Sequence, residues 1–204
     1  MNARGTRVVQ STERMHRTAW LCGLAAIAIV TSASTANALG PVDLEVGAKA
    51  GVGTSPAGEG ANPLGFGLGG RAGLVLFDHL YGGVNLMYYF GGSESAGQSP
   101  VASPAPTSVS VHTLMYGVEA GWGFKLLDIL VIRPQVGVGN ATFSSSSDGG
   151  GSSSNSNLYV EPGVTGLLYL GTLFVGADAN ALVFPGLADS NAAFTLHGQV
   201  GLKF

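Results

Sequence analysis

The sequence has little charge and almost no cysteine. Only 10% of its 204 residues are charged, and Cys22 is its one cysteine. Soluble domains typically carry about 25% charged residues, so the scarcity of charge disfavours an ordinary cytosolic enzyme. A single cysteine excludes a disulfide framework and a cysteine-based zinc site within the chain. Basic blocks are also missing and the formal net charge is −3, which argues against a nucleic-acid partner.

The N-terminus has the three parts of a secretory signal peptide. Four arginines come first, residues 19–30 are apolar, and small residues follow up to Ala36 and Ala38. This order predicts export and cleavage after Ala38. An uncleaved membrane anchor is the alternative, but the apolar run is shorter than the roughly 20 residues that a spanning helix needs. We therefore expect a cleaved signal peptide over 1–38 and one mature domain over 39–204.

Cleavage would change the composition of the chain. It would remove Cys22, four of the nine basic residues and one of the twelve acidic residues. The mature chain would then have five basic and eleven acidic residues, a formal net charge of −6, and no cysteine.

Period-two alternation of apolar and polar residues recurs along the mature chain. After residue 38 no apolar run reaches the length of a spanning helix, and helical periodicity is nearly absent. In the clearest segment, residues 42–53, apolar side chains alternate with glycine and charged residues. The alternation predicts eight β-strands, over residues 42–53, 64–77, 81–90, 109–125, 130–141, 158–170, 173–184 and 193–204.

The connections between these strands alternate in length. Three tight turns are predicted, at residues 77–80, 127–130 and 170–173. The other four connections are long and polar, over residues 54–63, 91–108, 144–157 and 185–191. Two stretches, the serine-rich residues 144–156 and the residues 93–110 rich in proline, alanine and serine, are expected to be flexible surface loops. This order predicts an antiparallel up-and-down barrel with both termini at the short-turn end.

The polar face of the predicted strands suits the inside of a narrow barrel. It consists mostly of glycine with few charges, which would cover a water-facing surface poorly but would fit the interior of an eight-stranded barrel. Aromatic residues gather near both ends of the apolar face, as at two membrane interfaces: Phe66, Phe90 and Phe194, and Trp122, Phe124 and Phe204. A closed barrel also pairs every backbone group within the membrane. The sequence thus predicts an all-β transmembrane barrel.

The mature chain resembles the small eight-stranded outer-membrane β-barrels of Gram-negative bacteria, similar to the OmpA and OmpX transmembrane domains. The most diagnostic part is the alternating last strand that ends in phenylalanine, with Leu196, Val200, Leu202 and Phe204. The resemblance implies short periplasmic turns, long extracellular loops and recognition of this strand by the barrel-assembly machinery after transit with periplasmic chaperones. It also implies contact with outer-membrane lipid and a monomer. No peptidoglycan-binding domain follows Phe204, so cell-wall tethering is not expected.

Seven polar residues are expected to project into the barrel and form a network. Unpaired charges are costly in a low-dielectric interior, so we expect ion pairs and hydrogen bonds among them. They are Lys49, Arg71, Glu119, Arg133, Glu161, Asp178 and His197. A packed polar core that fills the barrel is the first interpretation, and a narrow gated ion pore is the alternative.

Two sets of residues superficially suggest an enzyme. Asp178, His197 and Thr195 could supply an acid, a base and a nucleophile. Ser110 and His112 are the outward candidates for a lipid A-modifying enzyme, but they have no outward carboxylate nearby. We expect no catalytic, cofactor or metal site, and a structural or surface-display role.

Overall fold

The computed structural model describes residues 42–204 with four internal gaps. The described residues are 42–54, 62–95, 108–147, 152–185 and 192–204. The predicted signal peptide, with its expected cleavage site at Ala36 and Ala38, lies outside them. Within these ranges no helix is long and apolar enough to cross a membrane.

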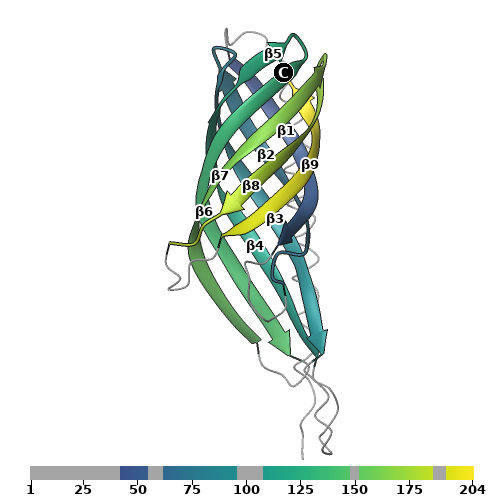
Figure 1. Cartoon of the computed structure of the whole chain (residues 1–204), viewed down its shortest axis with the longest axis vertical. Helices are drawn as coiled ribbons and strands as arrows, with labels where there is room; N and C mark the ends of the chain where they lie inside the picture. The colour runs from purple at the N-terminus through teal and green to yellow at the C-terminus, as the bar shows by residue number, and fades with distance from the viewer. Residues whose placement is uncertain (1–41, 55–61, 96–107, 148–151, 186–191) are drawn as a thin grey trace, which may run out of the picture. The chain divides into compact units, whose positions relative to one another are not determined.

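The described strands form one closed antiparallel barrel (Figure 1). Its segments are β1 (Val42–Thr54), β2 (Phe66–Leu76), β3 (Leu80–Ser95), β4 (Ser108–Trp122), β5 (Phe124–Leu127), β6 (Leu130–Ser147), β7 (Ser152–Leu170), β8 (Leu173–Leu182) and β9 (Ala193–Lys203). Each pairs with its neighbour in sequence, except that β4 and β5 both pair with β6, and β1 pairs with β9 to close the sheet.

Eight barrel strands arise from these nine segments because β4 and β5 are two parts of one strand. Both pair with β6, and they are separated at Gly123, whose N–H donates to the carbonyl oxygen of His79 at 2.7 Å. The predicted fold class, an eight-stranded antiparallel up-and-down transmembrane barrel, is confirmed.

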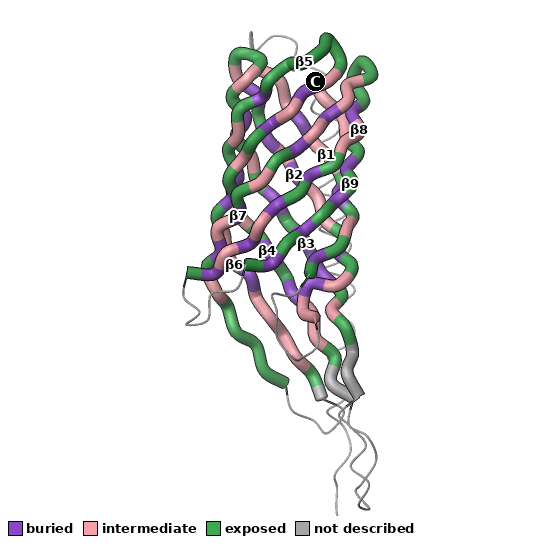
Figure 2. Tube along the Cα trace, viewed as in Figure 1, coloured by how far each residue is buried: buried purple, intermediate pink, exposed green. Residues whose placement is uncertain are grey.

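Buried and exposed residues alternate along most of the barrel strands (Figure 2), although all four residues of β5 are exposed. Charged side chains occupy many of the buried positions, and large apolar side chains occupy many of the exposed ones. On β9, buried and exposed residues alternate without a break from Ala193 to Val200. The interior residue His197 is 1% exposed, whereas the outward residues Val84 and Leu86 are 55% and 53% exposed. The apolar face is therefore the outer face.

Inward glycines make room for large interior rings. A Cβ atom on Gly73 would lie 2.5 Å from the ring of Tyr81, and one on Gly67 would lie 2.6 Å from the ring of Tyr89. Both tyrosines are 1% exposed. In a barrel of eight strands the interior is just wide enough for side chains, so these two rings fit only because glycine lies beside them on the neighbouring strand.

The predicted loop over 144–157 is wrong in its described part. The β6–β7 ladder continues from the barrel out to the pair Ser146 and Ser152, and Figure 1 shows β3, β4, β6 and β7 extending beyond the other strands. Antiparallel pairing depends on backbone hydrogen bonds and does not require apolar side chains. Hydroxyl groups also pair across the ladder, as between Thr142 and Ser156 at 2.7 Å.

A charge on the outer face should destabilise the barrel according to its depth. Leu86→Arg places a cation on the lipid-facing side and is expected to cost about 2–4 kcal/mol near the bilayer midplane. Ser154→Arg, on the exposed extension of β7, should leave the free energy of unfolding almost unchanged. Urea titrations of both variants in lipid vesicles measure the difference, and equal losses would contradict the outward assignment.

Candidate functional site

Glu45 on β1 is the centre of a buried charge cluster near the short-turn end. Arg133 on β6 donates from both terminal nitrogens to the two Glu45 carboxylate oxygens, each at 2.9 Å. Arg71 on β2 also forms an ion pair with Glu45, and the hydroxyl of Tyr169 on β7 donates to it. Glu45 and its three partners thus come from four strands, and the Glu45 side chain is fully buried.

Aromatic rings cover the two guanidinium groups of this cluster. The guanidinium carbons of Arg133 and Arg71 lie 4.3 Å and 4.9 Å from the centre of the Tyr81 ring. Arg71 also lies 5.4 Å from the Phe174 ring. Because the two cations share a single carboxylate, the negative faces of these rings supply part of the remaining stabilisation.

Asp178 on β8 is the centre of a second cluster. Its carboxylate lies 3.1 Å from the Lys49 ammonium, and it accepts hydrogen bonds from His197 Nδ1 and from the Asn180 amide, both at 2.7 Å. The hydroxyl of Tyr89 lies 2.7 Å from His197 Nε2. A neutral His197 with its proton on Nδ1 satisfies both contacts, because Nδ1 then donates to the carboxylate and Nε2 accepts from the tyrosine.

Two interior carboxylates depend on hydrogen bonds alone. Glu119 accepts from the Tyr81 hydroxyl at 2.7 Å and from the Asn85 amide at 3.1 Å. Glu161 accepts from the Thr195 hydroxyl at 3.5 Å. Neither carboxylate forms an ion pair with any residue that the structure describes.

An apolar layer lies inside the barrel at the long-loop end. It comprises Leu64, Met87, Tyr89, Met115, Ala141, Tyr159, Leu182, Phe184 and Ala193, with Phe143 packed against it. Leu64 is held there by its flanking residues, since its N–H donates to Asn62 Oδ1 at 2.9 Å and the Thr113 hydroxyl donates to the Pro63 carbonyl at 2.8 Å. This layer covers the polar clusters on the long-loop side.

The short-turn end has a polar hollow of about 300 Å³. Arg133 and Tyr169 line it together with Asp78, Lys125 and Lys203. The Lys125 ammonium lies 3.1 Å from the Asp78 carboxylate and lowers the pKa of this carboxyl group, which lies in the exposed β2–β3 turn. The polar interior is therefore approachable from the short-turn end.

All seven residues predicted for the interior network are buried inside the barrel. Five of them belong to the two clusters. Arg71 and Arg133 both contact Glu45, and Lys49 and His197 both contact Asp178. The expectation of ion pairs and hydrogen bonds among the seven is wrong for Glu119 and Glu161, because the hydrogen bonds of these two carboxylates come from neutral residues outside the set.

Glu45 is the main residue that the predicted network leaves out. It lies on the polar face of the first predicted strand, so its inward direction could be read from the alternation. Its two arginine partners come from β2 and β6, far apart in sequence. The four interior tyrosines, which supply hydroxyl groups to the buried carboxylates and to His197, Asn85 and Arg133, are also missing from the predicted set: Tyr81, Tyr89, Tyr159 and Tyr169.

The structure brings only part of each enzyme-like set together: Asp178 contacts His197, but Thr195 does not. Thr195 donates to Glu161, and His197 contacts Tyr89 instead. On the outer face, His112 stacks on Tyr88 at 5.8 Å, and the Ser110 hydroxyl pairs with Ser146. In the part of the chain that the structure describes, no three His, Cys, Asp or Glu side chains are grouped to hold a metal ion.

A closed eight-stranded barrel with an apolar outside and a packed polar inside defines the fold of the small outer-membrane β-barrels, and this chain is a transmembrane barrel of that fold. Three solved structures share it. A major outer-membrane protein of Thermus thermophilus matches with a TM-score of 0.53 at 14% identity, covering 80% of this chain and 99% of that one. Neisserial surface protein A matches with a TM-score of 0.51 at 16% identity, covering 80% and 97%.

The third structure is Ail, the attachment invasion locus protein of Yersinia pestis, in complex with the heparin analogue sucrose octasulfate. It matches with a TM-score of 0.51 at 16% identity, covering 80% of this chain and 97% of that one. No protein-family model and no curated protein matches this chain. At these identities the likeness concerns the fold alone.

Removing the Glu45 carboxylate charge should destabilise the barrel strongly. Glu45→Gln leaves two buried guanidinium groups without their counterion, and the loss of one partner of a buried ion pair costs about 3–5 kcal/mol. Glu161→Gln is the matched control, because Glu161 is buried on the same inner surface but forms no ion pair among the described residues. Unfolding free energies from urea titration should fall much further for Glu45→Gln, and equal losses would contradict the role of the Glu45 cluster.

Proposed function

We propose that this protein is a non-enzymatic, integral outer-membrane barrel whose role is to display its long connections at the cell surface. The observation that carries the proposal is the filled interior. Polar clusters around Glu45 and Asp178 occupy it, and the apolar layer around Leu64 covers them. A barrel filled in this way is a rigid support, and it leaves recognition to the surface at its ends.

The route to the membrane follows from the sequence and is part of the same proposal. A signal peptide over 1–38 would direct export, and periplasmic chaperones would deliver the chain to the barrel-assembly machinery. The machinery would recognise the last strand, with Leu196, Val200, Leu202 and Phe204. The barrel would then stand in outer-membrane lipid as a monomer, with its short turns in the periplasm and its long connections outside.

The charges of the chain limit the kind of surface ligand. Ail binds a sulfated heparin analogue. In this protein none of the five basic residues expected in the mature chain lies in a long connection. Lys49, Arg71 and Arg133 are buried, and Lys125 and Lys203 line the hollow at the short-turn end. Binding of a polyanion needs exposed cations, so the likeness to Ail does not support it for this chain.

A narrow ion pore is the second candidate. The polar hollow at the short-turn end favours it, because this hollow reaches Arg133 and the Glu45 cluster. The apolar layer at the other end opposes it, since an ion crossing that layer would lose its hydration without polar partners.

Cysteine labelling tests the proposed orientation, because the mature chain has no cysteine of its own. We expect Ser154→Cys, on the exposed extension of β7, to react with a membrane-impermeant maleimide in intact cells. Thr172→Cys, in the β7–β8 turn, should react only after the outer membrane is permeabilised. The reverse labelling pattern would show the opposite orientation in the membrane. If neither cysteine variant were labelled in the outer-membrane fraction, the proposed outer-membrane location would be contradicted.

Conductance in planar bilayers distinguishes the two candidate functions. The purified wild-type barrel should give no steps above the baseline, because the apolar layer blocks the interior. Discrete steps that change size when Lys49, Arg71 or Glu119 is neutralised would instead support the pore and contradict a purely structural interior.

A further inference from the structure

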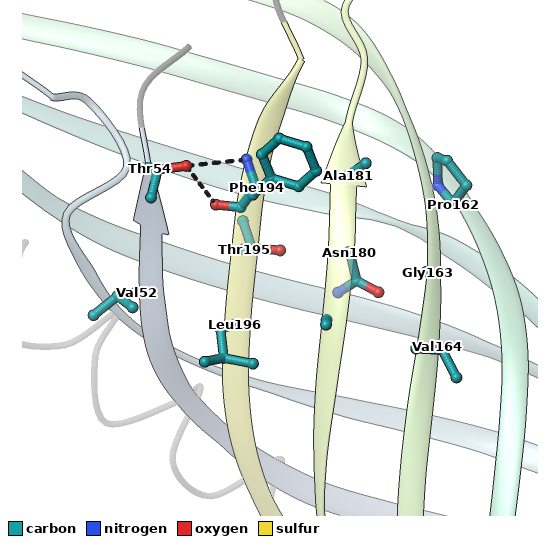
Figure 3. A pocket seen from close by; sticks show the side chains of 11 residues that line it. Val52, Thr54, Pro162, Gly163, Val164, Asn180, Ala181, Phe194, Thr195 and Leu196 are labelled. Carbon is teal, nitrogen blue, oxygen red and sulfur yellow. Dashed lines mark hydrogen bonds between the residues drawn. The ribbon is translucent and has the colours of Figure 1, made fainter. Parts of the chain in front are cut away.

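The outer surface of the barrel has an apolar hollow across four neighbouring strands. It lies on β7, β8, β9 and β1 near the long-loop end, and its volume is about 560 Å³ (Figure 3). Pockets for small molecules typically have volumes of roughly 300–1,000 Å³. The hollow is therefore large enough to hold part of a ligand.

Small residues on the middle strand produce this hollow. Ala179 and Ala181 of β8 form its floor, where only a Cβ atom projects outward. Larger side chains stand on both sides, with Leu196 of β9 57% exposed and Val164 of β7 44% exposed. Adjacent strands are about 4.8 Å apart, so these two walls stand about 10 Å apart across β8. Along β8 the hollow is thus a furrow one strand wide, and Val52 and Thr54 of β1 line its margin beyond the β9 wall.

The polar atoms around the furrow already have partners. The Thr54 hydroxyl at its end lies 3.3 Å from both the N–H and the carbonyl oxygen of Phe194 (Figure 3). Asn180 and Thr195 are buried, and they donate inward to Asp178 and Glu161. No charged residue lines the furrow. It therefore offers its occupant apolar contacts almost alone.

We propose that this furrow binds one acyl chain of a membrane lipid, drawn from the leaflet on the long-loop side. The furrow is continuous with the exposed apolar face that meets the bilayer, and its width across one strand fits a single hydrocarbon chain. A second barrel would present a broad convex wall that cannot enter so narrow a furrow. The proposal rests on the transmembrane placement of the barrel and adds a defined lipid site to it.

Filling the furrow tests the site. The wild type, Ala179→Phe and Ala120→Phe are each refolded into dimyristoylphosphatidylcholine nanodiscs, released in the mass spectrometer and scored for retained lipid. Ala120 is an outward, exposed alanine on β4 and serves as the control outside the furrow. We expect the wild type and Ala120→Phe to keep one lipid at collision energies that strip the others, and Ala179→Phe to lose the one-lipid peak. Ala181→Leu, a smaller change in the same furrow, should weaken that peak as well.

The possible contrary results are distinct. Equal lipid retention in all variants, or none in the wild type, would overturn the site. A dimer peak that Ala179→Phe abolishes would assign the furrow to a second copy and also overturn it. Each variant is first run on a gel with and without boiling. If the wild type itself shows no heat shift, the transmembrane placement fails, and the lipid site fails with it.

Discussion

The hydrogen-bonded closure between β1 and β9 is the constraint on which the rest of the structure depends. In a membrane every backbone N–H and C=O group needs a partner, and a sheet without edges is the only arrangement of strands that provides one. Closure with eight strands leaves an interior that side chains just fill. Inward glycines and tyrosines follow from that space, and outward apolar residues follow from the surrounding lipid.

The narrow interior in turn determines how the charges are held. A buried charge is costly unless it is paired and hydrogen-bonded, and most of the interior charges meet this requirement through shared groups. Two arginines share Glu45, and Asp178 contacts both Lys49 and His197. Tyrosine hydroxyls donate directly to Glu45 and Glu119, and a third tyrosine hydroxyl contacts the histidine that is bound to Asp178. The result is a filled polar core with an apolar layer at one end and a hollow at the other.

Much of this fold could be predicted from the sequence because period-two alternation fixes which face of each strand is polar. The partners inside the barrel could not be predicted in the same way. Glu45 and Arg133 lie on non-adjacent strands, and their contact across the interior depends on strand register and tilt. Met87 and Tyr89 share the polar face of β3, so nothing in the alternation marks the apolar layer they help to form. The strands at the serine-rich ends of β6 and β7 could not be predicted, because the side chains there do not alternate between apolar and polar.

The outward direction of the apolar face is the central claim, and gel migration of the mature protein with and without boiling tests it most directly. A membrane barrel refolded in detergent should resist the detergent when cold and migrate differently after heating. A protein that shows no such shift and remains soluble without detergent would have its apolar face enclosed, and its assignment as a membrane barrel would be contradicted.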